Sequence, residues 1–175
     1  MNSGPEGQRG LAAGRPSAPS QRLPARQGTS GRGDGYARMP KPTVLIVEDE
    51  ILIALDVEAA LSCAGFEVCG IAHSEAEAMK MAADCRPDLA IVDIGLSPGD
   101  GRNVAKALSN LYGTGVLFAS GQCNEVAGLR GTGAIACLPK PYRAEVVPAA
   151  FEALRRLHAG DRSRPLPGFM YPLAA

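Results

Sequence analysis

Five short apolar runs alternate with longer amphipathic segments between residues 43 and 158. The runs predict β-strands at 43–47, 66–72, 88–92, 115–119 and 134–138. Such runs, apolar at nearly every position, are typical of parallel strands that are buried on both faces of a sheet. The intervening segments predict helices at 50–64, 74–83, 102–110 and 143–158, and a weak, glycine-rich helix near 125–130. This alternation predicts an α/β fold with right-handed crossovers.

The boundaries of two helices carry specific signals. In the first helix, Ile53, Val57 and Leu61 repeat on one face, and Gly65 follows at a position that ends many helices. The second helix is preceded by Ser74, with Glu77 three residues later, which is the pattern of a capping box. These signals support helices, rather than further strands, between the apolar runs.

The expected strand order brings acidic residues together. Five parallel strands favour the order 2-1-3-4-5, a flavodoxin-like arrangement in which the first and third strands are neighbours. Glu48 and Asp49 directly follow the first strand, and Asp93 follows the third. Neighbouring strands lie about 5 Å apart, and open α/β sheets bind ligands at the carboxyl ends of their strands. We therefore expect these three carboxylates to converge.

The residues at these strand ends suit the chemistry of phosphoryl transfer. Three close carboxylates repel one another unless one holds a proton or a cation lies among them. Oxygen ligands at an open, hydrated edge favour Mg²⁺. Ser120 follows the fourth strand and Lys140 the fifth, so a hydroxyl and a positive charge are available for a phosphoryl group. Together these groups are suited to placing a phosphoryl group on a carboxylate.

Composition divides the chain into three parts. Residues 1–42 hold seven Lys and Arg against two acids, are rich in Gly and Pro, and are expected to be disordered. Residues 43–160 are expected to form the folded domain, and residues 161–175 a C-terminal tail. The chain from residue 43 has eleven basic against sixteen acidic residues, which argues against nucleic acid as its main ligand. Met39 is an alternative start, so residues 1–38 need not be present in the native protein.

The cysteines and the hydropathy point to a cytoplasmic protein. None of the five cysteines forms a Cys-x-x-Cys pair, and we expect reduced thiols in the role of small apolar residues. Reduced thiols fit the cytoplasm. No apolar run approaches the ~20 residues needed to cross a bilayer, and a secretory signal is not expected.

With these residues in view, the chain from Thr43 to about His158 resembles a response-regulator receiver domain of the CheY-like kind, the phospho-acceptor module of bacterial two-component signalling. The resemblance implies that Asp93 is the phosphorylated aspartate. It implies that Ser120 is the switch hydroxyl and that Lys140 corresponds to the invariant lysine of the family. It implies Mg²⁺ bound by Asp49, Asp93 and the backbone carbonyl of Gly95, with Glu48 acting mainly through water. It also implies a cis Lys140–Pro141 peptide bond, an isomer that only about 5–6% of X-Pro bonds adopt in folded proteins.

Residues 118–121, Phe-Ala-Ser-Gly, resemble the Phe-Ala-Thr-Gly stretch of one receiver subgroup. That subgroup works with stress and light signalling kinases of the HWE and second HisKA families. Cys137 occupies the position, three before Lys140, where receivers usually carry an aromatic that moves on activation. We therefore expect signalling through ordering of the segment after Ser120, with Cys137, Pro141 and Tyr142 at the switch and interface.

The resemblance implies a stand-alone response regulator that accepts a phosphoryl group from a sensor histidine kinase or a phosphotransfer protein. It would catalyse only its own phosphorylation and dephosphorylation. A downstream target protein and a second copy of the chain are its candidate partners; no membrane role is expected. Whether it switches a target, drains a kinase or carries phosphate in a relay stays open, as do the cognate kinase and stimulus.

Two other function classes compete with this interpretation. A receiver-like interaction module that no longer needs phosphate is the main alternative, because Cys137 departs from the usual pattern. A phosphohydrolase with Asp93 as nucleophile is disfavoured, since haloacid-dehalogenase-type enzymes carry a second Asp two residues later and this chain has Gly95 there.

Overall fold

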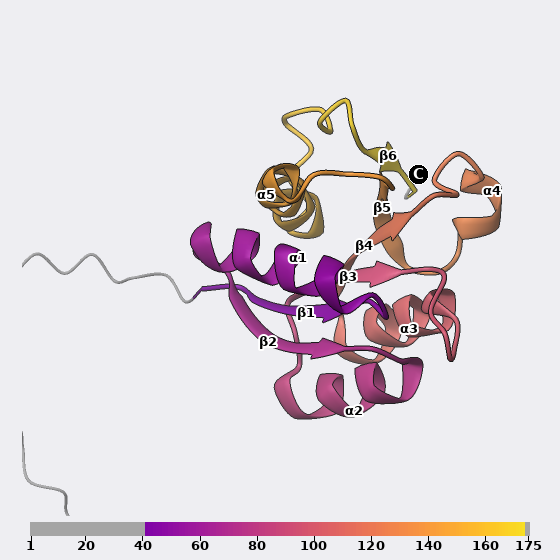
Figure 1. Cartoon of the computed structure of the whole chain (residues 1–175). Coiled ribbons are helices and arrows are strands. Elements are labelled where there is room, and N and C mark those ends of the chain that lie inside the picture. Colours follow the sequence, from indigo (N-terminus) through magenta and orange to yellow (C-terminus); the bar gives the residue numbers. More distant parts are fainter. Residues whose placement is uncertain (1–40, 174–175) are drawn as a thin grey trace, which may run out of the picture. The chain divides into compact units, whose positions relative to one another are not determined.

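The computed structural model describes residues 41–173, in which one sheet is covered by helices on both faces (Figure 1). The strands are β1 (Thr43–Val47), β2 (Glu67–Ala72), β3 (Leu89–Asp93), β4 (Gly115–Ser120), β5 (Ala134–Pro139) and β6 (Tyr171–Pro172). The helices are α1 (Ile51–Cys63), α2 (Glu75–Cys85), α3 (Gly101–Ala107), α4 (Val126–Leu129) and α5 (Val147–His158). The disorder predicted for residues 1–42 falls, for residues 1–40, outside the described range.

The sheet confirms the predicted order and adds a strand. Its order is β2-β1-β3-β4-β5-β6, and the first five strands are parallel. β6 pairs antiparallel with β5, so the sheet has six strands rather than the predicted five. The backbone N–H of Leu173 donates to the carbonyl of Ile135 across this edge at 3.0 Å.

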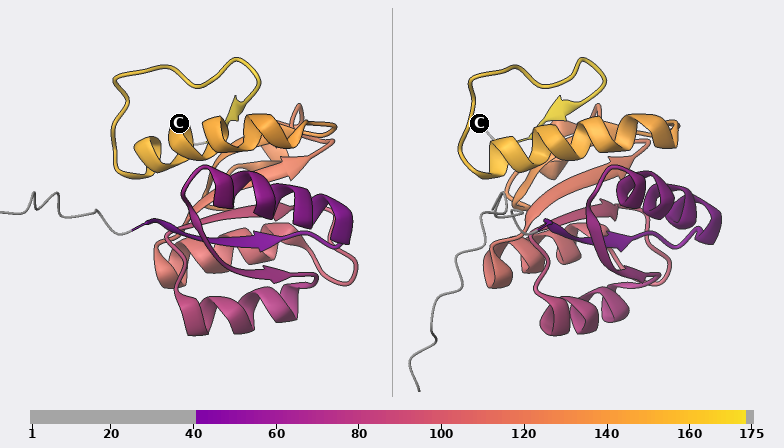
Figure 2. Two further views of the ribbon diagram at one scale, coloured as in Figure 1. Left: turned by 60° about the vertical axis from the view of Figure 1, so that its left-hand side comes forward. Right: turned by 90° about the vertical axis from the view of Figure 1, so that its left-hand side faces the viewer.

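Strands β1, β3, β4 and β5 are largely buried on both faces, as their apolar runs predict, whereas only Ala72 is buried in the edge strand β2. All six residues of β4 and four of the five in β1 are buried. One core lies between the sheet and α1 with α5, and includes Leu61 and Phe151. The other lies between the sheet and α2 with α3, and includes Ala82 and Leu108. Figure 2 shows α1 and α5 on one side of the sheet and α2 and α3 on the other.

Local signals account for most helix boundaries. Gly65, just after α1, has a left-handed φ of +92°, which glycine adopts without strain. Ser74 Oγ accepts a hydrogen bond from the N–H of Glu77 at 3.3 Å, so the predicted cap of α2 is confirmed. Helix α5 begins at residue 147 rather than 143, after a 3-10 turn at Ala144–Val146. Pro148 explains this, because proline is tolerated only in the first turn of a helix.

The other two helices are short. Helix α4 has four residues, as the weak pattern near 125–130 predicts. Helix α3 continues as a π-turn at Leu108–Tyr112 and ends at Gly113, whose φ is +68°. None of the helices within residues 41–173 has the length and apolar character needed to span a bilayer.

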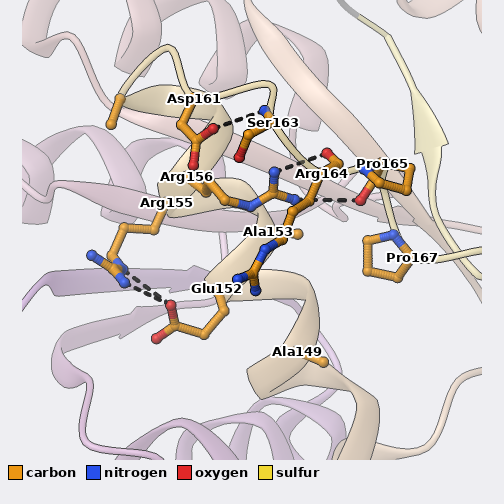
Figure 3. Close-up of a pocket in the computed structure, with 11 residues that line it drawn as sticks. Ala149, Glu152, Ala153, Arg155, Arg156, Asp161, Ser163, Arg164, Pro165 and Pro167 are labelled. Atoms are coloured by element: carbon orange, nitrogen blue, oxygen red, sulfur yellow. Dashed lines mark hydrogen bonds and ion pairs between the residues drawn. The ribbon is translucent and has the colours of Figure 1, made fainter.

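The C-terminal segment, predicted as a tail from residue 161, contacts the domain within residues 161–173. The guanidinium of Arg156 in α5 donates to the carbonyls of Arg164 at 2.8 Å and Pro165 at 3.3 Å (Figure 3). Further along, Met170 and Leu173 are buried. The apolar residues near the C-terminus therefore complete the core at the free edge of β5, which the sequence pattern did not reveal.

Candidate functional site

The three predicted carboxylates converge at the carboxyl ends of β1 and β3. Val47 pairs with Val92, which brings the residues that follow each strand side by side. One carboxylate oxygen from each of Glu48, Asp49 and Asp93 lies within 4.8 Å of the others. The structure thus contains the acidic cluster that the strand order predicts.

Lys140 reaches this cluster from the end of β5. Its Nζ donates to both carboxylate oxygens of Glu48, at 3.0 and 2.8 Å, and to Asp93 Oδ2 at 2.7 Å. All three side chains are largely shielded, with exposed fractions of 4% for Glu48, 12% for Asp93 and 19% for Lys140. Such charge-assisted hydrogen bonds are stronger than neutral ones, and fix the lysine charge beside Asp93.

Burial and charge act against each other on these groups. Burial raises the pKa of Glu48, and the hydrogen bonds and charge of Lys140 oppose this effect. Burial alone would lower the pKa of Lys140, but the hydrogen bonds that it donates to Asp93 and Glu48 outweigh burial and raise the pKa above its ordinary value. The lysine therefore stays protonated at neutral pH and supplies a permanent positive charge.

The loop after β3 closes around the aspartates. The N–H of Gly95 donates to Asp93 Oδ1 at 2.9 Å, and the N–H of Ser97 donates to Asp49 Oδ2 at 3.2 Å. Asp93 thus has one oxygen on a backbone amide and the other on Lys140. The predicted metal-ligand role of the Gly95 carbonyl stays a prediction, because the contact shown for Gly95 is made by its N–H.

Ser120 is the last residue of β4, and both its hydroxyl oxygen and its carbonyl oxygen accept hydrogen bonds. Its Oγ accepts from the N–H of Gln122 at 3.0 Å, and its carbonyl accepts from the N–H of Lys140 at 3.0 Å. The second bond ties the ends of β4 and β5 together. The hydroxyl proton of Ser120 remains available as a donor.

Pro141 and Tyr142, which were predicted to take part in the switch, follow directly after Lys140. The Lys140–Pro141 bond is cis, as predicted, and Ser97–Pro98 is a second cis bond. Tyr142 packs against the core beside α1 and α5, and its hydroxyl is buried without a hydrogen-bond partner among residues 41–173. Burial raises the pKa of Tyr142 to about 12.

Cys137 is not a free thiol, so the prediction that all five cysteines are reduced is wrong. It forms a disulfide with Cys123, the third residue after β4. Cys63, Cys69 and Cys85 are free. The two bonded residues are 14 positions apart in sequence, and only the fold brings them together, which is why spacing gave no signal.

The sequence analysis missed two supporting residues. His73 Nδ1 lies 2.8 Å from the carbonyl oxygen of Glu48, and since a carbonyl only accepts, the ring must donate there. Gly101 begins α3, and a Cβ at this position would collide with the carbonyl oxygen of Asp93. The Gly-rich turn before α3 was a usable signal for Gly101. Nothing in the sequence marks His73, whose role follows from the pairing of β2 with β1.

The donor set fits a divalent cation. Lys140 balances charge on Glu48 and Asp93, whereas within residues 41–173 the contact given to the Asp49 carboxylate is the backbone N–H of Ser97. An ion between Asp49 and Asp93 would offset this remaining charge with the oxygen ligands that Mg²⁺ prefers.

Among the grooves outside the carboxylate cluster, two bear on the description of the site. The larger, of about 650 Å³, lies between α5 and residues 161–167 (Figure 3). Its arginines are engaged: Arg155 pairs with Glu152 at 2.8 Å, and Arg156 holds backbone carbonyls. The smaller, of about 410 Å³, is lined by Lys140, Pro141 and Tyr142 together with residues of α1. Only the smaller groove adjoins the site.

A five-stranded parallel α/β core with an acidic cluster and a lysine at the strand ends defines a response-regulator receiver domain. The family model for the response regulator receiver domain matches residues 44–152, and the chain belongs to this family. Receiver domains of two-component systems interact with histidine kinases and downstream targets.

Named relatives agree with this assignment. The chain is 35% identical over 126 residues to the transcriptional regulatory protein PdtaR of Mycobacterium tuberculosis, an alignment that covers 70% of this chain and 61% of that protein. It is 39% identical over 77 residues to the phyllosphere-induced regulator PhyR of Methylorubrum extorquens, covering 43% of this chain and 29% of that protein. The chain thus matches less than two thirds of the length of either relative.

Solved structures share the fold. The chemotaxis response regulator CheY4 of Vibrio cholerae superposes with a TM-score of 0.58 at 27% identity, covering 66% of this chain and 99% of that one. The response regulator PhyR of Brucella abortus superposes with a TM-score of 0.60 at 25% identity, covering 71% and 51%.

Proposed function

We propose that this chain is a stand-alone response regulator that accepts a phosphoryl group on Asp93 and thereby changes its protein contacts. The observation that carries this proposal is the environment of Asp93. Its carboxylate lies between Lys140 and the N–H of Gly95, beside two further carboxylates. A phosphoryl group attached there would meet positive charge and backbone donors already in place.

The donor is proposed to be a phosphohistidine on a sensor kinase or a phosphotransfer protein. A carboxylate oxygen of Asp93 attacks the phosphorus, a P–O bond forms, and the P–N bond to the histidine breaks. Asp49, Asp93 and the Gly95 carbonyl would hold Mg²⁺, with Glu48 acting through water. When bound, the ion supplies positive charge to the phosphoryl oxygens.

Lys140 and Ser120 then bind the oxygens of the phosphoryl group on Asp93. The ammonium of Lys140 pairs with a phosphoryl oxygen, and its bonds to Glu48 and Asp93 rearrange. Ser120 donates its hydroxyl proton to another phosphoryl oxygen, which requires the segment after β4 to move toward Asp93. That segment and the adjoining face of β5 and α5 form the proposed contact surface for a target protein or a second copy of the chain.

We also propose a kinase class, an architecture and a location for this response regulator. The Phe-Ala-Ser-Gly stretch at 118–121 supports a kinase partner of the HWE or second HisKA type. The stand-alone type stays part of the proposal, and Tyr171–Pro172 pair with β5 as strand β6, so the described C-terminal residues belong to the receiver domain itself. We further propose that the protein is cytoplasmic and acts on no other substrate. Because its folded part is acidic, we also propose that it does not bind nucleic acid.

One specific observation favours the alternative, a receiver-like module that needs no phosphate. Lys140 already pairs with Glu48 and Asp93, and a disulfide already holds the segment after Ser120. A surface held by these ion pairs and by the disulfide could bind a partner without phosphorylation of Asp93.

Beryllofluoride, a mimic of the aspartyl phosphoryl group, separates the two functions. With Mg²⁺, the backbone amide signals of Gly95, Ser120 and Lys140 are expected to shift in the wild type and not in Asp93→Ala. Asp84→Ala is the matched control, because Asp84 is an exposed acid on α2. A wild-type spectrum unchanged by beryllofluoride and Mg²⁺ would favour the phosphate-independent module.

A further inference from the structure

The Cys123–Cys137 disulfide encloses the whole connection between β4 and β5. Its Cα atoms are 5.6 Å apart, within the roughly 4.4–6.8 Å seen in native disulfides. Both residues are buried, with exposed fractions of 1% and 0%. The backbone positions of the two residues therefore suit a bond between them without rearrangement.

The disulfide lies against the residues that respond to Asp93. Cys123 is three residues after Ser120, and its Sγ lies 3.3 Å from the Ser120 carbonyl oxygen. Cys137 is three residues before Lys140 and pairs with Phe118 in the sheet. Since the N–H of Lys140 donates to that same carbonyl of Ser120, the bond joins the two strand ends on which Ser120 and Lys140 stand.

The enclosed segment begins with residues bonded to Ser120. Its Oγ accepts from the N–H of Gln122 in this structure, and a turn of the Ser120 side chain toward a phosphoryl group on Asp93 breaks this bond and releases the start of the segment from β4. Gly131 and Gly133, with φ of +78° and +82°, form the return to β5. A covalent link from Cys123 to β5 limits movement of this segment, whereas two thiols do not.

The setting of the bond indicates a reversible role. Disulfides in a reducing cytoplasm are usually transient and redox-sensing, and the protein is proposed to be cytoplasmic. The other three cysteines are free, so one pair is bonded in this structure. Cys69 provides a contrast, because burial and the neighbouring Cys85 raise its pKa to about 12, which keeps that thiol protonated.

We propose that Cys123 and Cys137 form a reversible redox site that controls whether the segment 121–133 can respond to phosphorylation of Asp93. The oxidised form holds the segment in place, and the reduced form lets it rearrange. The inference rests on the proposed function for its effect on signalling, but formation of the disulfide itself does not depend on phosphate.

The oxidant is a small disulfide of the glutathione class. The thiolate of Cys123 attacks one glutathione sulfur, which forms a mixed disulfide and releases one glutathione thiolate. The thiolate of Cys137 then attacks the Cys123 sulfur and releases the second. Two protein thiols lose two protons and two electrons in total, and glutathione disulfide becomes two thiols. Cys123 is assigned the first step because it lies in a turn with exposed neighbours, Gln122 and Asn124; its own side chain is 1% exposed, so the attack requires this turn to open.

The first test measures the disulfide alone. A variant with Cys63, Cys69 and Cys85 replaced by Ser is equilibrated in buffers of reduced and oxidised glutathione, alkylated and weighed as the intact chain. We expect both remaining thiols to be alkylated under reducing conditions and neither under oxidising conditions. The matched control adds Cys137→Ala and should show only a glutathione adduct on Cys123. Peptide mapping of the wild-type chain repeats the measurement without substitutions.

The second test measures the coupling by NMR with beryllofluoride and Mg²⁺ in each redox state. We expect signals of Gly95 and Ala119 to shift in both states, and signals of residues 121–133 to shift further in the reduced state. Two thiols that stay alkylatable at every glutathione ratio would overturn the redox site and leave the proposed function standing. Equal shifts over 121–133 in both states would overturn the control of signalling. Absent shifts at Gly95 would instead count against the proposed function.

Discussion

Lys140 and Asp93 are joined by a side-chain hydrogen bond of 2.7 Å between Nζ and Oδ2, shorter than either bond that the same ammonium makes to Glu48. The bond crosses from the end of β5 to the end of β3 and passes over the end of β4 between them. One lysine thus links the proposed acceptor to the strand whose end carries the switch residues.

Replacing this lysine tests both stability and phosphorylation. Lys140→Gln removes the ion pairs to Asp93 and Glu48, and we expect a loss of about 2 kcal/mol in the free energy of unfolding, the magnitude typical of hydrogen bonds to charged groups. Phosphorylation by acetyl phosphate should also become slower. Urea unfolding and intact mass measure the two effects, with Lys106→Gln, an exposed lysine of α3, as control. Equal free energies of unfolding for the two variants would contradict the stabilising role of the Lys140 ion pairs.

Glu48 gives the protein a defined pH dependence. Burial raises its pKa above the ordinary value of 4.5, so the folded chain holds this proton more tightly than the unfolded chain. Linkage then requires the unfolding free energy to fall as pH rises from about 4.5 through the raised value, and to level off above it. Glu48→Gln, measured in metal-free buffer, should lack this fall. A difference between the two proteins that stays constant with pH across this window would contradict the prediction.

The buried hydroxyl of Tyr142 is a second titrating group. It has no hydrogen-bond partner among the described residues, and an unpaired buried hydroxyl costs about 1–3 kcal/mol. Tyr142→Phe should therefore match or exceed the stability of the wild type at pH 7. Since the pKa of the phenol is raised from 10 to about 12, the wild type should also lose stability between these pH values, and the variant should not.

The matched control for Tyr142 is Tyr171→Phe, because Tyr171 is 40% exposed. Its hydroxyl can bond to water in the folded state, so we expect no gain in stability. Urea unfolding at pH 7 and at alkaline pH compares the variants. A clear loss of stability in Tyr142→Phe would show that the hydroxyl has a partner that the structure lacks.

Gly101 permits the close approach of α3 to the acceptor strand. Ala at this position would place its Cβ against the carbonyl oxygen of Asp93, and relieving such overpacking typically costs about 1–3 kcal/mol. Gly101→Ala should also weaken the response to beryllofluoride, because the backbone at Asp93 must shift. Gly168→Ala is the control, as nothing lies within 4 Å of its added Cβ. Similar melting curves for both variants would refute the requirement for glycine at position 101.

Arg156 fastens the C-terminal segment. Arg156→Ala removes donors to the carbonyls of Arg164 and Pro165, and we expect faster hydrogen exchange at the Leu173 amide, which pairs with Ile135. Arg155→Ala is the control, because Arg155 bonds only along its own helix to Glu152. Unchanged exchange at Leu173 in Arg156→Ala would mean that β6 is held by its apolar residues alone.

Most of the site could be predicted from the sequence because two regularities coincide. Buried parallel strands are visible as apolar runs, and their carboxyl ends lie at one edge of the sheet. Glu48, Asp49, Asp93 and Lys140 each stand just past or at the end of such a run, so their convergence followed from the strand order.

What could not be predicted depends on contacts between distant segments. The strand β6 has two residues, one of them Pro172, and too short a pattern to stand out from a tail. The disulfide joins residues that share no spacing signature, and the contact of His73 with Glu48 depends on the register of β2. The start of α5 was misplaced because a 3-10 turn precedes Pro148, a detail of local geometry rather than periodicity.

The most direct test of the central claim is the mass of the intact chain after incubation with acetyl phosphate and Mg²⁺. We predict that the wild type and Asp84→Ala gain one phosphoryl group, that the gain needs Mg²⁺, and that Asp93→Ala gains none. A phosphoryl group on Asp93→Ala, or a wild type that remains unmodified with Mg²⁺ present, would contradict the assignment of Asp93 as the acceptor.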